Sequence, residues 1–530
     1  MGRSKVGLST ETSLVNALRR DLLAAEWTVD VVDGLLSPMA QAAMGRDQLV
    51  PAILEMRTQT SPAAVLTRLF VLAQPVKPGE LEYALPTLGV EGGVDLGLMV
   101  TGSENGVDVC RAVVDLRPHT ALIPIHDEDG EASPVQRFEW WVASDLSQAQ
   151  TGLPPSEDYV LGIASASTNL LRITLRDRVA SALDLGCGCG ILALYLSTHC
   201  DRVVANDISA RACSFTRFNA ALNQADIEVL EGSLFEPVAG QRFRLITSNP
   251  PFVITPQAVR ARCNLEYRDG GMERDNLIRK IVREAPSHLV EGGTLQMLAN
   301  WEVGQKERWW MRRPTAWIEE AANPLIEAGM DVRAWVVQRD LVDVAQYAEW
   351  WMRDQWGENV NADVWAAEYE EWLREFARSG TWHVGLGSIN LRVERARRGT
   401  AELSIVTEYL PDGEPVDGRA VATALDNLVV PEKWKDLTLQ RQSDVREARY
   451  FVPGQADPEL VRITQGRNGG RDRTVTSAVA ALIGVSDGEL TPGQVIPAIA
   501  MLLDKAESEV VSELEEALPE LLRSGVLKKP

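Results

Sequence analysis

Between about residue 160 and residue 300, short apolar runs alternate with amphipathic stretches, and this alternation constrains the fold more than any other feature of the chain. The apolar runs predict strands at 179–185, 202–206, 227–230, 243–248 and 294–299, and the intervening stretches predict helices at 191–197, 210–222 and 277–289. Strands that alternate with helices at this period predict an α/β fold with a doubly wound, mostly parallel sheet. Ligands of such sheets bind at the carboxyl ends of the strands.

The sheet is expected to continue with strands at 331–338 and 386–394. Between them lies a helical insertion, near 340–383, that is rich in aromatic residues. These residues include Trp350, Trp351, Trp356, Trp365, Tyr369 and Trp372. Two interpretations fit the pattern. The aromatic side chains form the core of the insertion, or they form a lid over the mouth of a substrate site.

The chain has 530 residues, which is too long for one hydrophobic core, since cores stop growing near ~250–300 residues. We predict an N-terminal α+β domain at 1–150, an α/β domain at 151–398 and a C-terminal accessory region at 399–530. Similar octapeptides at 81–88 and 514–521 favour a small winged-helix module near each end, the second within 473–530. Two unrelated leucine-rich helices would explain the likeness equally well.

Composition narrows the class of partner and the compartment. The formal net charge of −22 disfavours indiscriminate binding to nucleic acid, because phosphate contacts need a basic face. No run approaches the ~18 apolar residues of a spanning helix, so no membrane partner is expected. The six cysteines show no disulfide-framework spacing, which favours the reducing cytoplasm. Cys187, Cys189 and Cys200 lack the paired spacing of zinc sites, and no metal is predicted.

A glycine-rich loop follows the strand predicted at 179–185 and opens the next helix. Gly186, Gly188 and Gly190 let the backbone turn sharply and approach a ligand closely. Such a loop would also serve a dinucleotide. Asp184, just before the loop, suits the cationic methionine moiety of a cofactor, and Asp207, at the end of the next strand, suits ribose hydroxyls. Either aspartate alone would also serve as a helix N-cap.

This segment resembles the class I S-adenosylmethionine-dependent methyltransferases, whose first motif is similar to residues 184–190. The resemblance implies S-adenosyl-L-methionine as cofactor, with the three glycines along its amino-acid part and Asp207 on its ribose. Residues 231–237 look like the stretch that contacts the adenine, through the Ser233 hydroxyl and the Leu234 backbone N–H. The family often has aspartate where this chain has Ser233. By this resemblance, 151–398 is a methyltransferase domain.

The tetrapeptide Asn249, Pro250, Pro251 and Phe252 follows the strand predicted at 243–248. Consecutive prolines after a strand are, by themselves, a rigid turn. At this edge of the sheet they suit methyl transfer to a planar amide or amine nitrogen, whose lone pair is delocalised. The Asn249 side-chain oxygen and the Pro250 carbonyl would each accept one N–H, and Phe252 would offer a flat face. Transfer is then an in-line displacement that depends on positioning.

The tetrapeptide resembles two groups of enzymes with an Asn-Pro-Pro-Phe/Tyr motif. One methylates a glutamine side chain on translation release factors or ribosomal proteins, and the other methylates exocyclic amines of RNA or DNA bases. Gly270 and Gly271, followed by Asp275, look more like the glutamine group. A macromolecular substrate is therefore implied, most simply a glutamine of a translation-related protein, with an rRNA or tRNA base as the alternative. The sequence gives no indication of an oligomeric state.

Basic residues near the expected mouth favour the RNA alternative. Residues 257–283 hold seven basic and four acidic residues. Further basic residues follow at Lys306, Arg308, Arg312, Arg313, Arg392, Arg395, Arg397 and Arg398. They would contact phosphates, or they would simply form a solvated helix face. A non-catalytic binding protein with the same fold is a third reading, and the intact Asp184, Asp207 and Asn249 argue against it.

Overall fold

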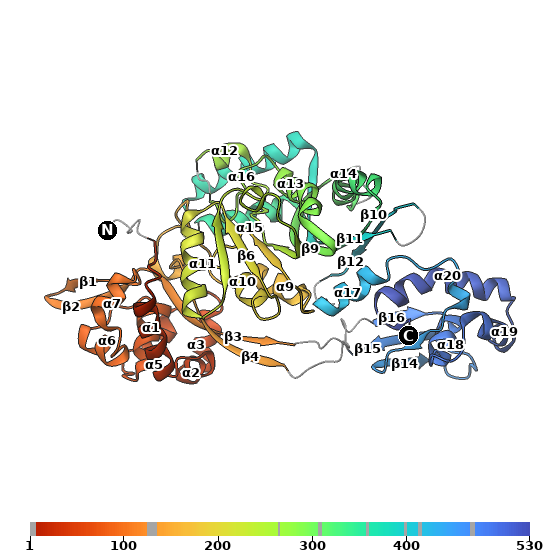
Figure 1. Ribbon diagram of the computed structural model, residues 1–530, viewed down its shortest axis with the longest axis horizontal. Helices are drawn as coiled ribbons and strands as arrows, with labels where there is room; N and C mark the ends of the chain where they lie inside the picture. Colours follow the sequence, from red (N-terminus) through yellow and green to blue (C-terminus); the bar gives the residue numbers. More distant parts are fainter. Residues whose placement is uncertain are drawn as a thin grey trace.

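An eight-stranded sheet forms the centre of the molecule (Figure 1). The computed structural model describes residues 7–124, 135–262, 265–305, 310–356, 360–396, 400–411, 416–466 and 472–529. The strands of this sheet are β5 (Ala182–Leu185), β6 (Val203–Asp207), β7 (Ile227–Glu231), β8 (Phe243–Ser248), β9 (Leu289–Gly304), β10 (Met330–Asp343), β11 (Thr381–Arg395) and β12 (Leu403–Tyr409). Their spatial order is β12-β10-β11-β9-β8-β5-β6-β7.

Neighbouring strands from β7 to β9 are parallel, and β11 runs antiparallel between β9 and β10. The predicted doubly wound, mostly parallel sheet is therefore confirmed. The sheet also extends past 398, where the predicted α/β domain ends. β12 lies parallel to β10, from Val332 opposite Leu403 to Gln338 opposite Tyr409. The predicted boundary at 398 is wrong because residues 403–409 add a further parallel strand to the edge of the sheet.

Helices cover both faces of the sheet (Figure 1). On one face lie α9 (Ser165–Ile173), α10 (Ile191–Leu196), α11 (Ala210–Leu222) and α17 (Gly418–Asp426). On the other lie α13 (Asn276–Glu284) and α14 (Arg312–Glu327). Side chains of β5 alternate between the faces, since Leu183 and Leu185 pack in the core of the second face and Ala182 in a cluster with α10. Short turns are α12 (Gln257–Arg260), η2 (Glu236–Val238), η3 (Ala285–His288) and η4 (Trp434–Asp436).

The N-terminal region is helical and then forms two hairpins. Its elements are α1 (Thr12–Ala24), α2 (Val29–Leu35), α3 (Pro38–Met44), α4 (Val50–Met56), α5 (Pro62–Leu66), η1 (Thr67–Val71), α6 (Pro78–Ala84), α7 (Gly89–Asp95), β1 (Met99–Glu104), β2 (Val107–Ala112), β3 (Asp115–Ile123), β4 (Gln136–Ser144) and α8 (Gln148–Thr151). Two amide side chains of α11 bond to the β4 backbone. Asn219 exchanges hydrogen bonds with both backbone groups of Ala143, and Asn223 does so with Trp141.

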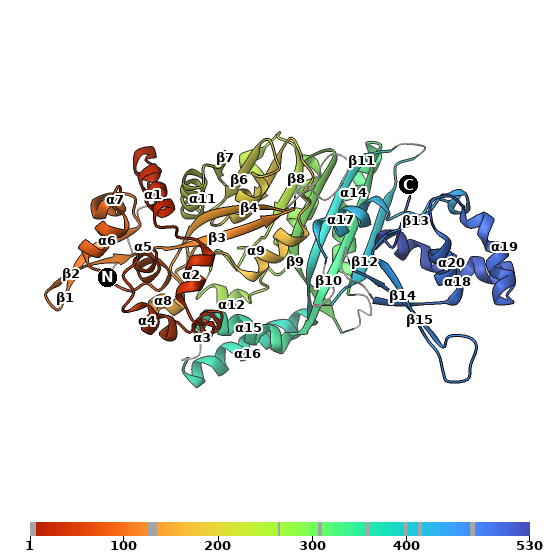
Figure 2. The same ribbon diagram turned by 90° about the horizontal axis from the view of Figure 1, so that it is seen from below.

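The C-terminal region packs around a hydrophobic core of its own, at the opposite end of the molecule from the N-terminal region (Figures 1 and 2). Its elements are β13 (Gln440–Arg441), β14 (Val445–Tyr450), β15 (Leu460–Gln465), β16 (Asp472–Val475), α18 (Ser477–Val485), α19 (Pro492–Leu503), α20 (Glu507–Arg523) and β17 (Leu527–Lys528). The similar octapeptides are not equivalent: 81–88 runs past the end of α6, whereas 514–521 lies wholly inside α20. The two octapeptides therefore do not occupy equivalent places in their helices.

The aromatic-rich insertion is a helical hairpin, α15 (Val344–Trp356) and α16 (Ala362–Ser379), beside α12 (Figure 2). Tyr347, Trp372 and Phe376 are buried in its core together with Val253 and Ile254, which directly follow the tetrapeptide. The insertion thus shares one core with the segment that follows the tetrapeptide. None of the described helices is both long and apolar enough to cross a bilayer.

Candidate active site

A cavity of about 380 Å³ lies at the carboxyl ends of β5, β6 and β8. This volume falls in the range of about 300–1,000 Å³ that is usual for small-molecule sites. Sequence-predicted residues that line it are Gly186, Gly188, Asp207, Ser233, Leu234, Asn249, Pro250 and Pro251. Parallel strands bring these residues together because their carboxyl ends meet at one edge of the sheet.

The glycine loop adopts the backbone conformation that its composition predicts. Gly186, Gly188 and Gly190 have φ angles of 79°, 54° and 81°, in the left-handed region. At Gly190, which lies outside the cavity wall, a Cβ atom would come within 2.8 Å of the Thr216 side chain, so α11 also excludes any larger residue there. The loop can therefore follow the cavity wall closely and still enter α10 without a clash.

Asp207 joins the loop to the end of β6. Its Oδ2 accepts the Gly188 backbone N–H at 3.0 Å, and its Oδ1 accepts the Ser209 N–H at 2.9 Å. Burial raises the pKa of this carboxyl above its ordinary value. Each carboxylate oxygen keeps a second lone pair, so the side chain is held in place and can still accept hydroxyl groups from a ligand.

Asp184 occupies a different place from the one predicted. Its side chain is fully buried, and its Oδ2 accepts the Ala193 backbone N–H of α10 at 3.0 Å. Burial raises the pKa of Asp184 to about 7. Alternate β5 side chains face opposite sides of the sheet, so Asp184 points under the loop toward α10. It supports the loop and does not line the cavity.

The predicted adenine end depends on Asn206, which no motif in the sequence pointed to. Ser233 and Leu234 line the cavity, and Leu234 has a left-handed φ of 47°. The Asn206 side chain, from β6, donates from Nδ2 to the Leu234 carbonyl oxygen at 2.8 Å. Asn206 therefore holds the turn that carries both residues. Its position directly before Asp207 was the available signal.

Asn249 presents an unpaired acceptor at the cavity wall. Its Nδ2 donates to the Ser167 hydroxyl, on α9, at 3.2 Å. Its Oδ1 is buried and has no hydrogen-bond partner among the described residues. An unpaired buried acceptor costs about 1–3 kcal/mol, so the site is suited to a ligand that brings an N–H. Ser167 lies 82 residues before Asn249 in the chain, and no sequence signal connects them.

Phe252 does not face this cavity. It lines a second cavity, of about 350 Å³, between α9, β9, β10 and the insertion. Its backbone forms a single antiparallel bridge with Asp269. The tetrapeptide therefore separates two cavities, with Asn249 to Pro251 on one side and Phe252 on the other.

Most of the basic residues at 257–283 have carboxylate or carbonyl partners among the described residues. Arg268 and Asp269 form a fully buried ion pair, Arg279 pairs with Glu320, and Arg283 lies 3.6 Å from Glu284. Lys306, Arg308, Arg397 and Arg398 lie outside the described residues.

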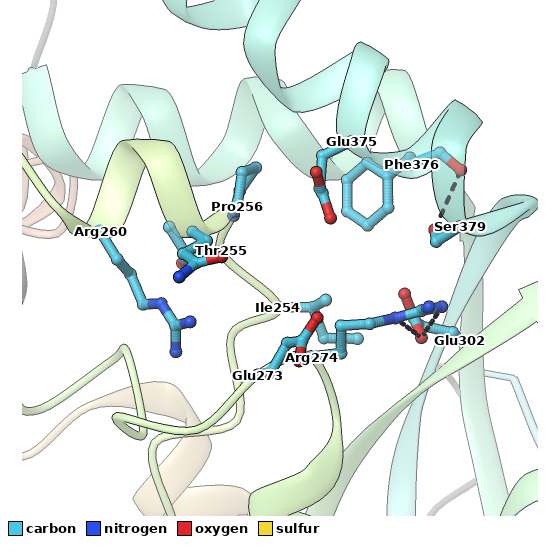
Figure 3. Close-up of a pocket in the computed structure, with 11 residues that line it drawn as sticks. Ile254, Thr255, Pro256, Arg260, Glu273, Arg274, Glu302, Glu375, Phe376 and Ser379 are labelled. Atoms are coloured by element: carbon cyan, nitrogen blue, oxygen red, sulfur yellow. Dashed lines mark hydrogen bonds and ion pairs between the residues drawn. The ribbon is translucent and has the colours of Figure 1, made fainter.

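The stretch after Gly270 and Gly271 is anchored by buried charges. Both glycines line the first cavity. Arg274 pairs with Glu302 of β9, beside a small polar pocket between this stretch and α16 (Figure 3). Buried Asp275 accepts from Arg313 at 2.7 Å and from the Glu302 backbone N–H at 3.2 Å. These charges fix the stretch to the sheet, so they serve the fold more than the capture of phosphates.

These features define a class I S-adenosylmethionine-dependent N-methyltransferase. They are the fold, the left-handed glycine loop, the Asp207 carboxylate at the end of β6 and the unpaired amide oxygen of Asn249. Residues 162–322 match the model of the methyltransferase small domain, and residues 24–109 match a domain of unknown function, DUF7059.

Curated relatives agree with this class. The release factor glutamine methyltransferase of Deinococcus radiodurans is 34% identical over 209 residues, which cover 37% of this chain and 70% of that protein. A putative protein N5-glutamine methyltransferase of Methanocaldococcus jannaschii is 28% identical over 186 residues, 34% of this chain and 90% of that protein. Ribosomal RNA small subunit methyltransferase C of Alcanivorax borkumensis is 30% identical over 121 residues, 23% of this chain and 32% of that protein. The chain belongs to this family of small-domain N-methyltransferases.

Proposed function

We propose that this enzyme methylates the side-chain amide nitrogen of a glutamine in a protein of the translation machinery, in the cytoplasm. The observation that supports this most directly is the amide of Asn249. Its Nδ2 is held by Ser167 and its Oδ1 is left as a buried, unpaired acceptor at the cofactor cavity. A primary amide brings an N–H of the kind that this acceptor lacks.

The residues of the site position the acceptor nitrogen. Asn249 Oδ1 accepts one N–H of the glutamine amide and the Pro250 carbonyl accepts the other, while the prolines keep both acceptors rigid. The cofactor, when bound against the glycine loop and Asp207, supplies an electrophilic methyl group on sulfur. Transfer of this methyl group to the amide nitrogen would leave the electron pair of the sulfur–carbon bond on sulfur, so the residues of this chain would have only to hold and orient the nitrogen. The nitrogen would then release a proton to water. Correct positioning of the two reactants can lower the activation barrier by up to ~7–11 kcal/mol.

Two further observations favour a protein substrate. The matched region of this chain covers 70% and 90% of the two relatives that are named glutamine methyltransferases. It covers only 32% of the Alcanivorax RNA methyltransferase. Most of the arginines at 257–283 are already paired with carboxylates or carbonyl groups, which reduces their attraction for phosphate. The likeness to the RNA enzymes keeps an exocyclic base amine as the second candidate.

The test is to incubate the enzyme with labelled S-adenosylmethionine and a cell lysate, and then to digest separate aliquots with nuclease and with protease. We expect label that survives nuclease and is lost to protease, and complete enzymatic digestion should yield N5-methylglutamine by mass spectrometry. Label lost to nuclease would replace this proposal with base methylation. An Asn249→Ala enzyme is the control, and equal labelling by it would show that the tetrapeptide does not carry the reaction.

A further inference from the structure

The second cavity adjoins the cofactor cavity across a shared wall. Pro251 lines the first cavity, and Phe252, the next residue, lines the second. Likewise, Ser167 of α9 lines the first, while Ser165 and Ala166 line the second. The tetrapeptide and the first turn of α9 therefore stand between the two. A planar group in the second cavity would therefore lie against Phe252, one residue away from the wall of the cofactor cavity.

The lining of the second cavity suits a polypeptide segment. Three aromatic side chains contribute to it, Phe252, Trp350 and Trp351. Aliphatic residues supply much of the remaining wall, namely Ala166, Ile173, Leu298, Ala299, Val337, Leu386 and Val416. Trp350 is 37% exposed, so the cavity has an accessible aromatic edge. Among the described lining residues, Arg172 and Arg339 carry positive charge and Asp340 carries negative charge, whereas nucleic-acid strands need several cations along the phosphates.

The insertion forms a fixed side of this cavity. The Tyr347 hydroxyl of α15 accepts the Ile254 backbone N–H at 3.0 Å and the Asn300 Nδ2 at 3.0 Å. The buried Arg268 guanidinium donates to the Trp351 carbonyl at 3.0 Å and to Gln355 at 3.1 Å. Since Ile254 lies two residues after Phe252, α15 is bonded directly to the catalytic loop. Movement of α15 away from the loop would leave several buried polar groups unpaired, which argues against a hinged lid.

We propose that the second cavity is the acceptor cleft of this enzyme and binds a glutamine-bearing peptide segment, with Trp350 as its main contact residue. Tyr347 is a positioning residue, because its hydroxyl fixes the insertion relative to the segment that follows the tetrapeptide. This inference rests on the proposed function, because it places the glutamine amide between Phe252 and Asn249. It also assigns the insertion a role in choosing the substrate.

The central test compares two tryptophan variants. Trp350→Ala removes the contact residue, while Trp382→Ala removes a half-exposed tryptophan of β11 that does not line the cavity. With nuclease-treated lysate protein as acceptor and labelled S-adenosylmethionine, Trp350→Ala should lower kcat/KM at least about 10-fold, as truncation of a central aromatic anchor does. Trp382→Ala should change it less than twofold. Cofactor affinity, measured by calorimetry, should stay within twofold for both.

Tyr347→Phe tests the positioning role, since it keeps the buried ring and removes only the hydroxyl. We expect kcat to fall about fivefold, with little change in the KM for the nuclease-treated lysate protein. The variant should still melt in one cooperative transition. A rise in KM without loss of kcat would contradict the positioning role.

Three outcomes separate this inference from the proposed function. If Trp350→Ala acts like wild type while Asn249→Ala is inactive, the cleft is assigned wrongly and the reaction stands. If the label sits on RNA and Trp350→Ala reduces it, the cleft binds a base and the peptide assignment fails. If Asn249→Ala keeps full activity, the proposed function itself is wrong.

Discussion

The two cavities that meet at the tetrapeptide are built in different ways. The cofactor cavity is formed mainly by turns at the ends of consecutive parallel strands, and Asp207, Ser233 and Asn249 lie next to those strands in sequence. The second cavity collects side chains from α9, the tetrapeptide, β9, β10, α15 and β11. The donor half of the reaction thus depends on local backbone geometry, while the acceptor half depends on packing between distant segments. Cofactor use and substrate choice can therefore vary independently.

The largest effect is expected at the boundary between the two halves. Asn249→Ala removes the acceptor for the substrate N–H without touching the glycine loop, so transfer should fall below about 1% of wild type. Cofactor affinity should remain within a few-fold, measured by calorimetry. Full activity in this variant would mean that the amide oxygen does not position the nitrogen.

Asp207→Ala should disturb only the donor half. Loss of a carboxylate that binds hydroxyl groups costs about 1.5–3 kcal/mol, which makes the cofactor Kd about 10- to 150-fold weaker. At saturating cofactor, KM for the protein fraction should stay close to wild type. An unchanged Kd would remove the ribose role of Asp207.

Ser167→Ala probes the link between α9 and the tetrapeptide. Without the Ser167 hydroxyl, the Asn249 amide loses the bond that orients it, and kcat should fall about 3- to 10-fold. Thr168→Ala is the matched control, since Thr168 is exposed on the same helix and only bonds back to the Ala164 carbonyl. Equal rates for the two variants would show that the Asn249 amide needs no such support.

The smallest effect concerns stability and pH. Because the folded-state pKa of Asp184 is raised to about 7, the folded protein binds a proton that the unfolded chain has already lost above pH ~4. This group therefore contributes stability that is lost as pH rises toward and through 7. When the pH is raised from 5 to 8, the Tm of the wild type should fall by about 2 °C or more in excess of the fall in the Tm of Asp184→Asn. Parallel melting curves would indicate an ordinary pKa for Asp184.

The donor half was predictable because its residues follow strands directly. Once the alternation of strands and helices indicates a parallel sheet, topology alone brings Gly188, Asp207 and Asn249 to one edge. Ser167 was not predictable, because its contact with Asn249 depends on how α9 packs over the sheet. The direction of the Asp184 side chain was not predictable. The sequence places this carboxylate next to the glycine loop, but it does not show which face of the sheet the side chain points to.

Charge was the least reliable guide. The run of arginines at 257–283 suggests a phosphate site when it is read along the chain. In three dimensions Arg268 is completely buried against Asp269, and Arg279 meets Glu320 from α14. Carboxylates that neutralise a basic run can come from distant segments, so a count within one window overestimates its field.

The side-chain amides of Asn219 and Asn223 bear on how this protein was assembled in evolution. They complete the hydrogen bonding of β4 as a neighbouring strand would, and α11 and the N-terminal helices share one hydrophobic core. A catalytic domain cut free at this junction would expose apolar surface and leave backbone groups of β4 unsatisfied. The N-terminal region is therefore not an interchangeable attachment. It must be inherited together with α11, and homologues that lack it are expected to carry a different, more polar surface on that helix.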